Sequence, residues 1–265
     1  MRAPNRNASD YAYFDAPFSA FAHRGGWDEN IGEELENSLA AFRHAVDDLG
    51  YRYVETDVHA TRDGQLLAFH DMRLDRVTDR TGAVGELDWS QVRGARIGGR
   101  EPIPTLDEVL EALPGALINI DIKEANAIEP LVRTIRRHGA QERVCVASFS
   151  PGRLAAFRRA AGPRVATAAS LGAVAWSSFV PLLPRFVNAG VQAFQVPVRQ
   201  KLGPVRIRVL TRNLLRTARA RDMRVHVWTI DDPEQMRSLM DAGVDGIVSN
   251  RIDELKALCT ARDLW

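Results

Sequence analysis

The stretch Leu117-Ile-Asn-Ile-Asp-Ile-Lys123 alternates between apolar and polar residues. This period predicts a β-strand that has isoleucines on one face and Asn119, Asp121 and Lys123 on the other. A lone carboxylate in such an apolar strand is costly unless it has a partner or a function. In a barrel of parallel strands, the polar face would line the lumen and point toward its mouth.

Similar short apolar runs recur along the whole chain, with helical patterns between most of them. The nine runs cover residues 18–23, 53–59, 66–70, 116–123, 143–149, 164–170, 192–197, 224–230 and 246–250. Repeated alternation of strands and helices is typical of a (β/α)₈ barrel or a doubly wound sheet. Because no glycine-rich nucleotide fingerprint follows the first run, we predict the α/β class and a (β/α)₈ TIM-type barrel.

The barrel is expected to be somewhat irregular, because the sequence has nine candidate strands and a (β/α)₈ barrel has eight. Only residues 60–65 separate the second run from the third, which is too short for a crossover helix. A bare return along the barrel and an antiparallel hairpin both remain open. We therefore predict a short helix-free connection between strands 2 and 3 in a single domain of residues 1–265. Residues 1–17 would be an N-terminal extension, and residues 72–104 a long connection over the mouth or flank.

The composition of the chain limits which molecules it is expected to bind and where in the cell it is expected to be. The 265 residues carry a formal net charge of +1 and no basic run, so we expect no nucleic-acid partner. No apolar stretch reaches the ~20 residues of a membrane span, and the N-terminus lacks the apolar core of a secretory signal. Two cysteines make neither a metal motif nor a disulfide framework. We expect a cytoplasmic protein whose oligomeric state stays open.

Glu55 and Asp57 are candidate metal ligands, because residues two apart on a strand share one face. Two carboxylates pointing into a lumen repel each other unless a cation lies between them, and hard oxygen ligands suit Mg²⁺ or Ca²⁺. The alternative is the solvent-exposed face of an edge strand. Asp121 would be a third ligand, or it would form an ion pair with Lys123. Glu36, just before a helix start, is a further candidate ligand.

His23 and His70 each end an apolar run and are candidate acid and base catalysts. Either one alone would be read as a buried core histidine. Together, the two suggest a pair that straddles a reacting phosphorus atom. Phe149 and Trp228, each at the end of a run, would either line a substrate pocket or pack inside the barrel.

Several short motifs in order resemble those of the glycerophosphodiester phosphodiesterases. They are His23-Arg24-Gly25-Gly26, Glu36-Asn37-Ser38, Val54-Glu55-Thr56-Asp57-Val58, Phe69-His70-Asp71, Asn119-Ile120-Asp121-Ile122-Lys123 and Gly243-Val244-Asp245-Gly246-Ile247. The resemblance implies that His23 and His70 are catalytic. It implies one divalent cation, held by Glu55, Asp57 and Asp121. Arg24, Glu36 and Lys123 would surround the phosphate or the metal.

The activity implied is metal-dependent hydrolysis of a small glycerophosphodiester to glycerol 3-phosphate and an alcohol. His23 is assigned as the acid and His70 as the base, although the exchanged roles fit the sequence equally well. The chain departs from the family pattern at Asp121, where glutamate is common, and at Ser249-Asn250, where Thr-Asp is frequent. The alternatives are a phospholipid headgroup hydrolase, of the lysophospholipase D or sphingomyelinase D kind, and a non-catalytic barrel that serves as a binding module. The apolar segment 174–183 would pack on the barrel or make peripheral contact with lipid.

Overall fold

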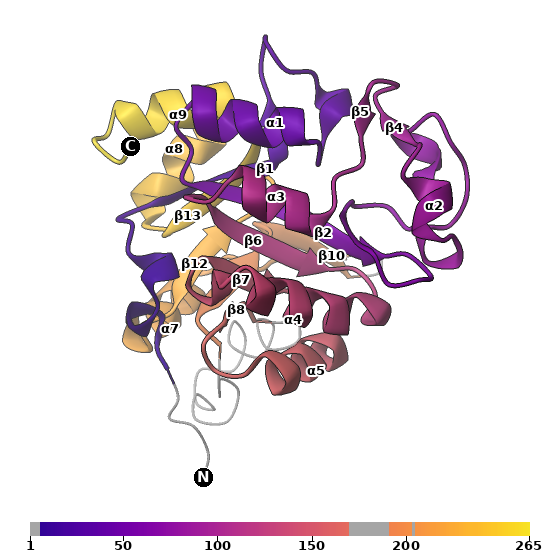
Figure 1. Ribbon diagram of the computed structural model, residues 1–265. Coiled ribbons are helices and arrows are strands. Elements are labelled where there is room, and N and C mark those ends of the chain that lie inside the picture. The colour runs from indigo at the N-terminus through magenta and orange to yellow at the C-terminus, as the bar shows by residue number, and fades with distance from the viewer. Residues whose placement is uncertain (1–5, 170–190, 203–204) are drawn as a thin grey trace.

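The computed structural model describes residues 6–169, 191–202 and 205–265 (Figure 1). Eight parallel strands form a nearly closed barrel with helices around it, so the predicted fold is confirmed. The order around the barrel is β8-β7-β6-β2-β1-β13-β12-β9. An isolated parallel bridge between Ala168 and Ala193 joins the two ends of this order. The apolar segment 174–183 lies outside the described residues.

Each barrel strand coincides with one of the predicted runs. The strands are β1 (Ser19–Trp27), β2 (Tyr53–Ala60), β6 (Leu117–Ile122), β7 (Val144–Ala147), β8 (Ala166–Thr167), β9 (Ala193–Val196), β12 (Arg224–Val227) and β13 (Gly246–Arg251). The α-helices that follow barrel strands are α1 (Leu39–Arg43), α4 (Ile128–Arg137), α5 (Pro151–Ala161), α8 (Pro233–Ala242) and α9 (Ile252–Thr260), and α3 (Leu106–Ala112) and α7 (Arg212–Ala220) precede β6 and β12. Short 3₁₀ helices are η1 (Ala8–Asp10), η2 (Ala12–Phe14), η3 (Glu33–Leu35), η5 (Leu74–Arg76), η6 (Val84–Glu86), η7 (Ala125–Ala127) and η8 (Ala140–Glu142), and η4 (His44–Asp48) is a π-helix.

The ninth run is β3 (Leu66–Ala68), which lies off the barrel. It pairs antiparallel with β2, with Val58 opposite Ala68. The backbone N–H of Thr61 donates to the Gln65 carbonyl at 2.9 Å and closes the turn between the two strands. The prediction of a helix-free connection is therefore confirmed, and the hairpin is the correct one of the two alternatives.

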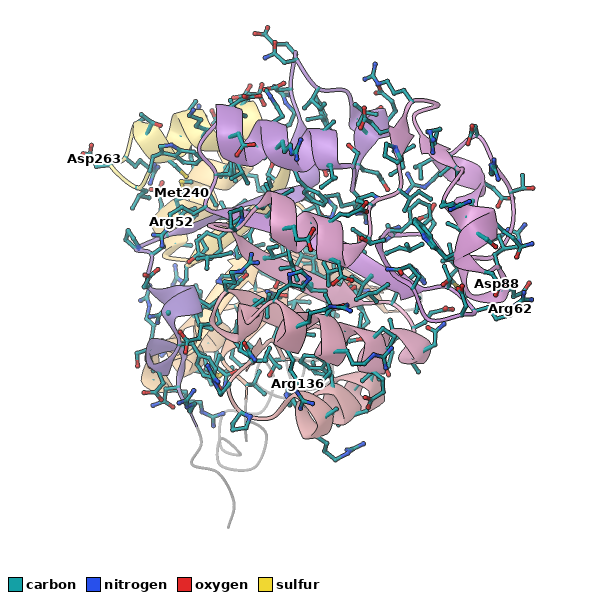
Figure 2. The ribbon with its side chains drawn as sticks, viewed as in Figure 1. Arg52, Arg62, Asp88, Arg136, Met240 and Asp263 are labelled. Carbon is teal, nitrogen blue, oxygen red and sulfur yellow. The ribbon has the colours of Figure 1, made fainter. Side chains whose placement is uncertain are left out.

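The segment that follows β3 builds a small unit beside the mouth of the barrel. It contains α2 (Trp89–Val92), β4 (Arg96–Ile97) and β5 (Glu101–Pro102), which lie at the end of the barrel toward which β2 and β6 run (Figure 1). Its own apolar cluster includes Leu74, Val84 and Ile97, all buried. Arg62 and Asp88, labelled in Figure 2, form an ion pair of 2.6 Å that ties the β2–β3 turn to α2. The sequence did not predict this β4–β5 pair, nor the hairpin of β10 (Arg199–Leu202) and β11 (Val205–Arg208).

The lumen is apolar at the N-terminal ends of the strands and is covered there by the N-terminal segment. Tyr13 and Phe14 are buried against Phe21 and Tyr53 in one inner cluster. The rings of Tyr13 and Tyr53 meet edge to face, with their centroids 5.5 Å apart. A larger cluster fills the space between the strands and the surrounding helices. In the described part of the chain, no helix is both long and apolar enough to cross a bilayer.

Candidate active site

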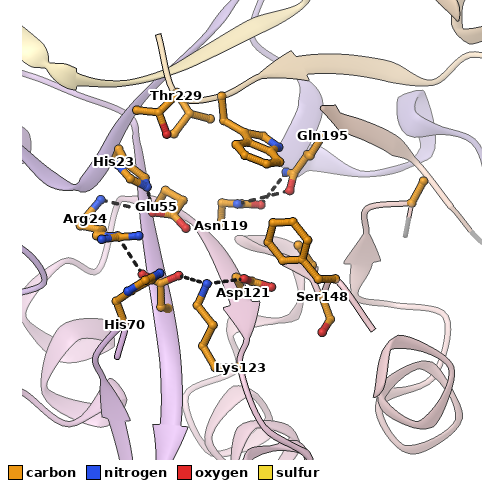
Figure 3. A pocket seen from close by; sticks show the side chains of 16 residues that line it. His23, Arg24, Glu55, His70, Asn119, Asp121, Lys123, Ser148, Gln195 and Thr229 are labelled. Carbon is orange, nitrogen blue, oxygen red and sulfur yellow. Dashed lines mark hydrogen bonds and ion pairs between the residues drawn. The ribbon is translucent and has the colours of Figure 1, made fainter. Parts of the chain in front are cut away.

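Strand register brings the predicted site residues together at the C-terminal ends of the strands. His23 pairs with Glu55, Glu55 with Asn119, and Asp57 with Asp121. These side chains enter a cavity of about 220 Å³ (Figure 3). The predicted residues that line it are His23, Arg24, Glu55, Asp57, His70, Asp121, Lys123, Phe149 and Trp228. Glu36 does not line this cavity but contacts Arg24 beside it.

A register shift within β1, just after His23, directs Arg24 toward the mouth. Arg24 has φ +54°, and Gly25 and Gly26 follow with φ +90° and +70°. A Cβ atom on Gly26 would lie 2.3 Å from a methyl group of Ile252, so this position requires glycine. The Arg24 guanidinium lies 3.1 Å from Asp57 and 3.2 Å from Glu36. The His-Arg-Gly-Gly motif thus fixes one arginine between two carboxylates.

Three buried carboxylates share two cationic side chains. The Lys123 ammonium lies 2.7 Å from both Asp57 and Asp121. Burial and the neighbouring Asp57 raise the pKa of Glu55 well above its usual range. Burial also acts to raise the pKa of Asp57, but Lys123 and Arg24 outweigh it and lower that pKa to about 2. Burial raises the pKa of Asp121 to about 6 in spite of Lys123. Burial is the main cause of the raised pKa of Glu55 and of Asp121, and the neighbouring Asp57 adds to both.

The donor set suits a divalent cation, although its side chains do not already form a cage. Among the described residues, no group of three or more histidine, cysteine or carboxylate side chains converges on one point. The predicted Asp121–Lys123 ion pair is present. However, Asp121 Oδ1 is buried with no hydrogen-bond partner, and the oxygens of Glu55 and Asp57 are hard ligands. The alternative of a solvent-exposed edge strand is wrong, because Glu55 and Asp57 are buried on a central strand.

His23 and His70 have different hydrogen-bond partners. His23 Nδ1 lies 2.6 Å from the amide oxygen of Asn250, and its Nε2 lies 3.7 Å from Glu55. Burial and then Arg24 lower the pKa of His23. His70 follows the end of β3, and its Nδ1 lies 2.6 Å from the Asp71 carboxylate. The backbone carbonyl of His70 lies 3.0 Å from Nε2 of His59.

The sequence did not predict a role in the site for three polar residues that lie in or beside it. Asn250 contacts His23, and His59 is fully buried behind His70. Gln195 donates a 2.7 Å hydrogen bond across the lumen to Asn119, which lies below the charged cluster. His59 could have been found by extending the two-residue period of Glu55 and Asp57. No local signal marked Gln195.

Two cavities meet at His23 and Arg24. In the first, the rings of Phe149 and Trp228 meet edge to face, with their centroids 5.6 Å apart, and form an apolar wall. The second cavity has a volume of about 650 Å³ and lies toward the segment that contains Arg76. His23 and Arg24 therefore have open space on two sides.

Comparison with known proteins places the chain in a family. Residues 23–254 match the glycerophosphoryl diester phosphodiesterase family. This chain belongs to that family. It is 42% identical over 251 residues to a probable glycerophosphodiester phosphodiesterase 2 of Mycobacterium tuberculosis, which covers 93% of this chain and 92% of the relative. It is 27% identical over 270 residues to human lysophospholipase D GDPD1, with 89% and 84% covered.

Solved structures agree with the fold. A putative glycerophosphoryl diester phosphodiesterase of Silicibacter pomeroyi superimposes with a TM-score of 0.77 at 20% identity, covering 95% of this chain and 98% of that one. A phosphodiesterase of Oleispira antarctica, solved with the product sn-glycerol-3-phosphate, gives a TM-score of 0.75 at 24% identity, with 95% and 99% covered. The family resemblance and the barrel predicted from the sequence are both confirmed.

Proposed function

We propose that this chain is a metal-dependent hydrolase that cleaves glycerophosphodiesters to glycerol 3-phosphate and an alcohol. The observation that carries the proposal is one cavity lined by two histidines, three buried carboxylates, Arg24 and Lys123. The names of the M. tuberculosis relative and of the Oleispira product complex support the same substrate class.

Arg24 and Lys123 would attract and orient the substrate's phosphate. A phosphodiester carries one negative charge, which repels an attacking oxygen. Both cations line the cavity and are held in place by Asp57, so their charge is already aimed before substrate arrives. Preorganised charge of this kind is usually the largest contribution to rate enhancement.

Glu55, Asp57 and Asp121 would hold one divalent cation, Mg²⁺ or Ca²⁺, and Glu36 is a further candidate. When bound, such a cation supplies Lewis-acid withdrawal of charge from a nonbridging phosphate oxygen. The unpartnered Asp121 Oδ1 and the raised pKa of buried Glu55 support this assignment.

The two histidines would carry the proton transfers. One removes a proton from the attacking oxygen, which is a water or the glycerol 2-hydroxyl, while the new P–O bond forms. The other donates a proton to the leaving oxygen as the old P–O bond breaks. Each transfer typically contributes ~10²–10⁴-fold to the rate. Attack by the 2-hydroxyl would give a cyclic phosphate, which the same pair would then hydrolyse with exchanged roles.

The test is release of glycerol 3-phosphate from glycerophosphocholine in the presence of Mg²⁺ or Ca²⁺. We expect turnover by the unsubstituted protein, loss on chelation, and at least a 100-fold lower rate in His23→Ala and His70→Ala. A folded protein that turns over neither this substrate nor other phosphodiesters would instead be a binding module.

A second candidate is headgroup removal from lysophospholipids. The name of the human lysophospholipase D relative and the apolar wall with half-exposed Phe149 favour it. Faster choline release from lysophosphatidylcholine than from glycerophosphocholine would support this candidate. Choline release from sphingomyelin alone would indicate the sphingomyelinase D kind.

A further inference from the structure

A chain of three side chains leads from His23 away from the cavity. Asn250, on β13, contacts His23 Nδ1 with its amide oxygen at 2.6 Å. The Asn250 amide nitrogen donates to Asp231 Oδ2 at 2.8 Å. Asp231 Oδ1 accepts the Asn250 backbone N–H at 2.8 Å and the Ser249 hydroxyl at 3.0 Å. Asp231 is thus fixed by contacts that do not involve the histidine.

These contacts determine which nitrogen of His23 carries the proton. An ionised carboxylate only accepts hydrogen bonds, so the amide NH₂ of Asn250 must face Asp231. The amide oxygen then faces His23, and an oxygen without a hydrogen can only accept. Nδ1 of His23 must therefore be the donor.

The other nitrogen, Nε2, is left as the acceptor in the neutral ring. It lies on the cavity side, 3.7 Å from Glu55, a distance too long for a hydrogen bond. Nε2 is therefore directed at the place where a reacting oxygen would bind.

We propose that Asp231 and Asn250 are positioning residues that keep the His23 proton on Nδ1, which makes His23 the base of the first step. This proposal rests on the proposed function. His23 Nε2 takes the proton from the attacking hydroxyl as its oxygen bonds to phosphorus. The proton for the leaving oxygen then comes from His70, whose ring faces the Asp71 carboxylate.

The decisive variant is Asp231→Asn, which keeps the size of the side chain, removes its negative charge and replaces one accepting oxygen by a donating NH₂. Its amide oxygen would still accept from the Asn250 backbone and from Ser249, so its NH₂ would face Asn250. Asn250 would then turn its own oxygen toward residue 231 and its NH₂ toward His23. Nδ1 of His23 would have to accept, and the proton would move to Nε2.

We expect Asp231→Asn to lower kcat for glycerophosphocholine at least 100-fold and to change KM less than threefold. In protein labelled with ¹⁵N-histidine, the NMR signals of neutral His23 should change from the Nδ1–H to the Nε2–H tautomer. The double variant Asp231→Asn/Asn250→Asp restores an amide that donates to a carboxylate, with an oxygen on His23. It should recover kcat to within tenfold of the original and restore the Nδ1–H signals.

The matched control is Asp245→Asn at the opposite end of β13. Asp245 accepts the Val225 backbone N–H at 2.8 Å and lies outside the cavity. This variant should lower the melting temperature while it changes kcat less than twofold. A purely structural role for Asp231 would make the two variants alike in kcat.

The division of roles has its own test with a 4-nitrophenyl phosphodiester, whose leaving group departs without a proton. His70→Ala should then lose less than tenfold in rate, and His23→Ala at least 100-fold. The reverse order, an Nε2–H signal in the unsubstituted protein, or an unchanged kcat in Asp231→Asn would overturn the proposal. Absence of turnover by the unsubstituted protein would instead reject the proposed function, and the NMR result would still decide the tautomer.

Discussion

Arg24 has the most constrained backbone of the described site residues. Its φ of +54° lies in the left-handed region, which costs a residue with a side chain about 1–3 kcal/mol. The Arg24 carbonyl accepts the Asn37 N–H at 2.8 Å, and this contact ties the irregular stretch of β1 to the segment before α1. The unfavourable conformation is retained because it turns the guanidinium toward Asp57 and Glu36.

Arg24→Lys should lower kcat/KM for glycerophosphocholine by about 10- to 100-fold, the range for loss of a hydrogen bond between charged groups. A lysine ammonium is a point charge that cannot reach Asp57 and Glu36 together. The measurement is steady-state kinetics. Arg62→Lys is the control, because Arg62 donates two hydrogen bonds to Asp88 and does not line the cavity. Equal losses in both variants would contradict the assigned role of Arg24.

Asp121→Asn tests the proposed cation site without any assay of turnover. Bound Mg²⁺ or Ca²⁺ should stabilise the unsubstituted protein by about 2.7 kcal/mol at a concentration 100 times Kd. Loss of one negative ligand should weaken binding at least tenfold, seen as a smaller thermal shift at equal cation concentration. Asp107→Asn, whose side chain pairs with His138 on the outside of the barrel, should keep the full shift. A full shift in Asp121→Asn would contradict ligation by this residue.

Single site residues could be predicted from the sequence where the residues that reveal them lie within a few positions on the same strand. Glu55 and Asp57 follow from their two-residue spacing, and Asp121 from its isolation among isoleucines. Asn250 could not be predicted in the same way. It contacts His23 across 227 sequence positions, and only the closure of the barrel brings the two together.

At the scale of elements, the C-terminal half of β1 shows how one irregular stretch of strand supports several contacts. Gly26 lies against Ile252 of α9 and against the Asn250 carbonyl. Three consecutive residues with positive φ shift the register between β1 and β13 within this small space, and both sides of the shift stay parallel. A defect here would therefore disturb both the helix packing and the site.

Gly26→Ala should destabilise the protein by about 3 kcal/mol, measured by urea unfolding. Overpacking contributes about 1–3 kcal/mol and the positive φ about 1–2 kcal/mol. Gly139→Ala is the matched control, because Gly139 has φ +60° and a Cβ atom added there would meet nothing within 4 Å. It should cost about 1 kcal/mol, from the positive φ alone. Similar costs at both positions would show that the contact with Ile252 is not limiting.

The long strands could be predicted because the two-residue period and β-branched residues persist over several positions. The two-residue strands β4 and β5 have no such period. The orientation of β3 could not be predicted either, because residues 60–65 can span a hairpin or a bare return. The pairing of Val58 with Ala68 depends on contacts that no local pattern encodes.

For the molecule as a whole, polarity rises along the lumen from one end to the other. Aromatic rings fill the N-terminal end, the Asn119–Gln195 pair crosses the middle, and charged groups gather at the mouth. His226 is the exception at the apolar end. It is fully buried against Phe14 and Phe21, and neither ring nitrogen has a partner.

His226 should make the fold sensitive to acid. Burial, followed by repulsion from Arg224, lowers the pKa of His226 to about 3 from the usual 6.5. Between these values the unfolded chain binds more protons than the folded one, so stability falls as pH falls. The loss at pH 5 is about 2 kcal/mol, from about 1.4 kcal/mol per pKa unit.

His226→Phe should remove this part of the acid sensitivity. The measurement is urea unfolding at pH 8 and pH 5 for both proteins. We expect the drop in unfolding free energy between these two pH values to be about 2 kcal/mol smaller in the variant. An equal drop in both proteins would show that His226 does not titrate in this way.

Tyr13 and Phe14 cover the N-terminal end of the barrel, and this limits how substrate enters and products leave. In the described part of the chain, aromatic rings pack across the N-terminal end, so we expect substrate and both products to pass through the mouth at the C-terminal ends of the strands. Each product must therefore leave through the mouth before the next substrate molecule can bind. Accumulated product is expected to act as a competitive inhibitor.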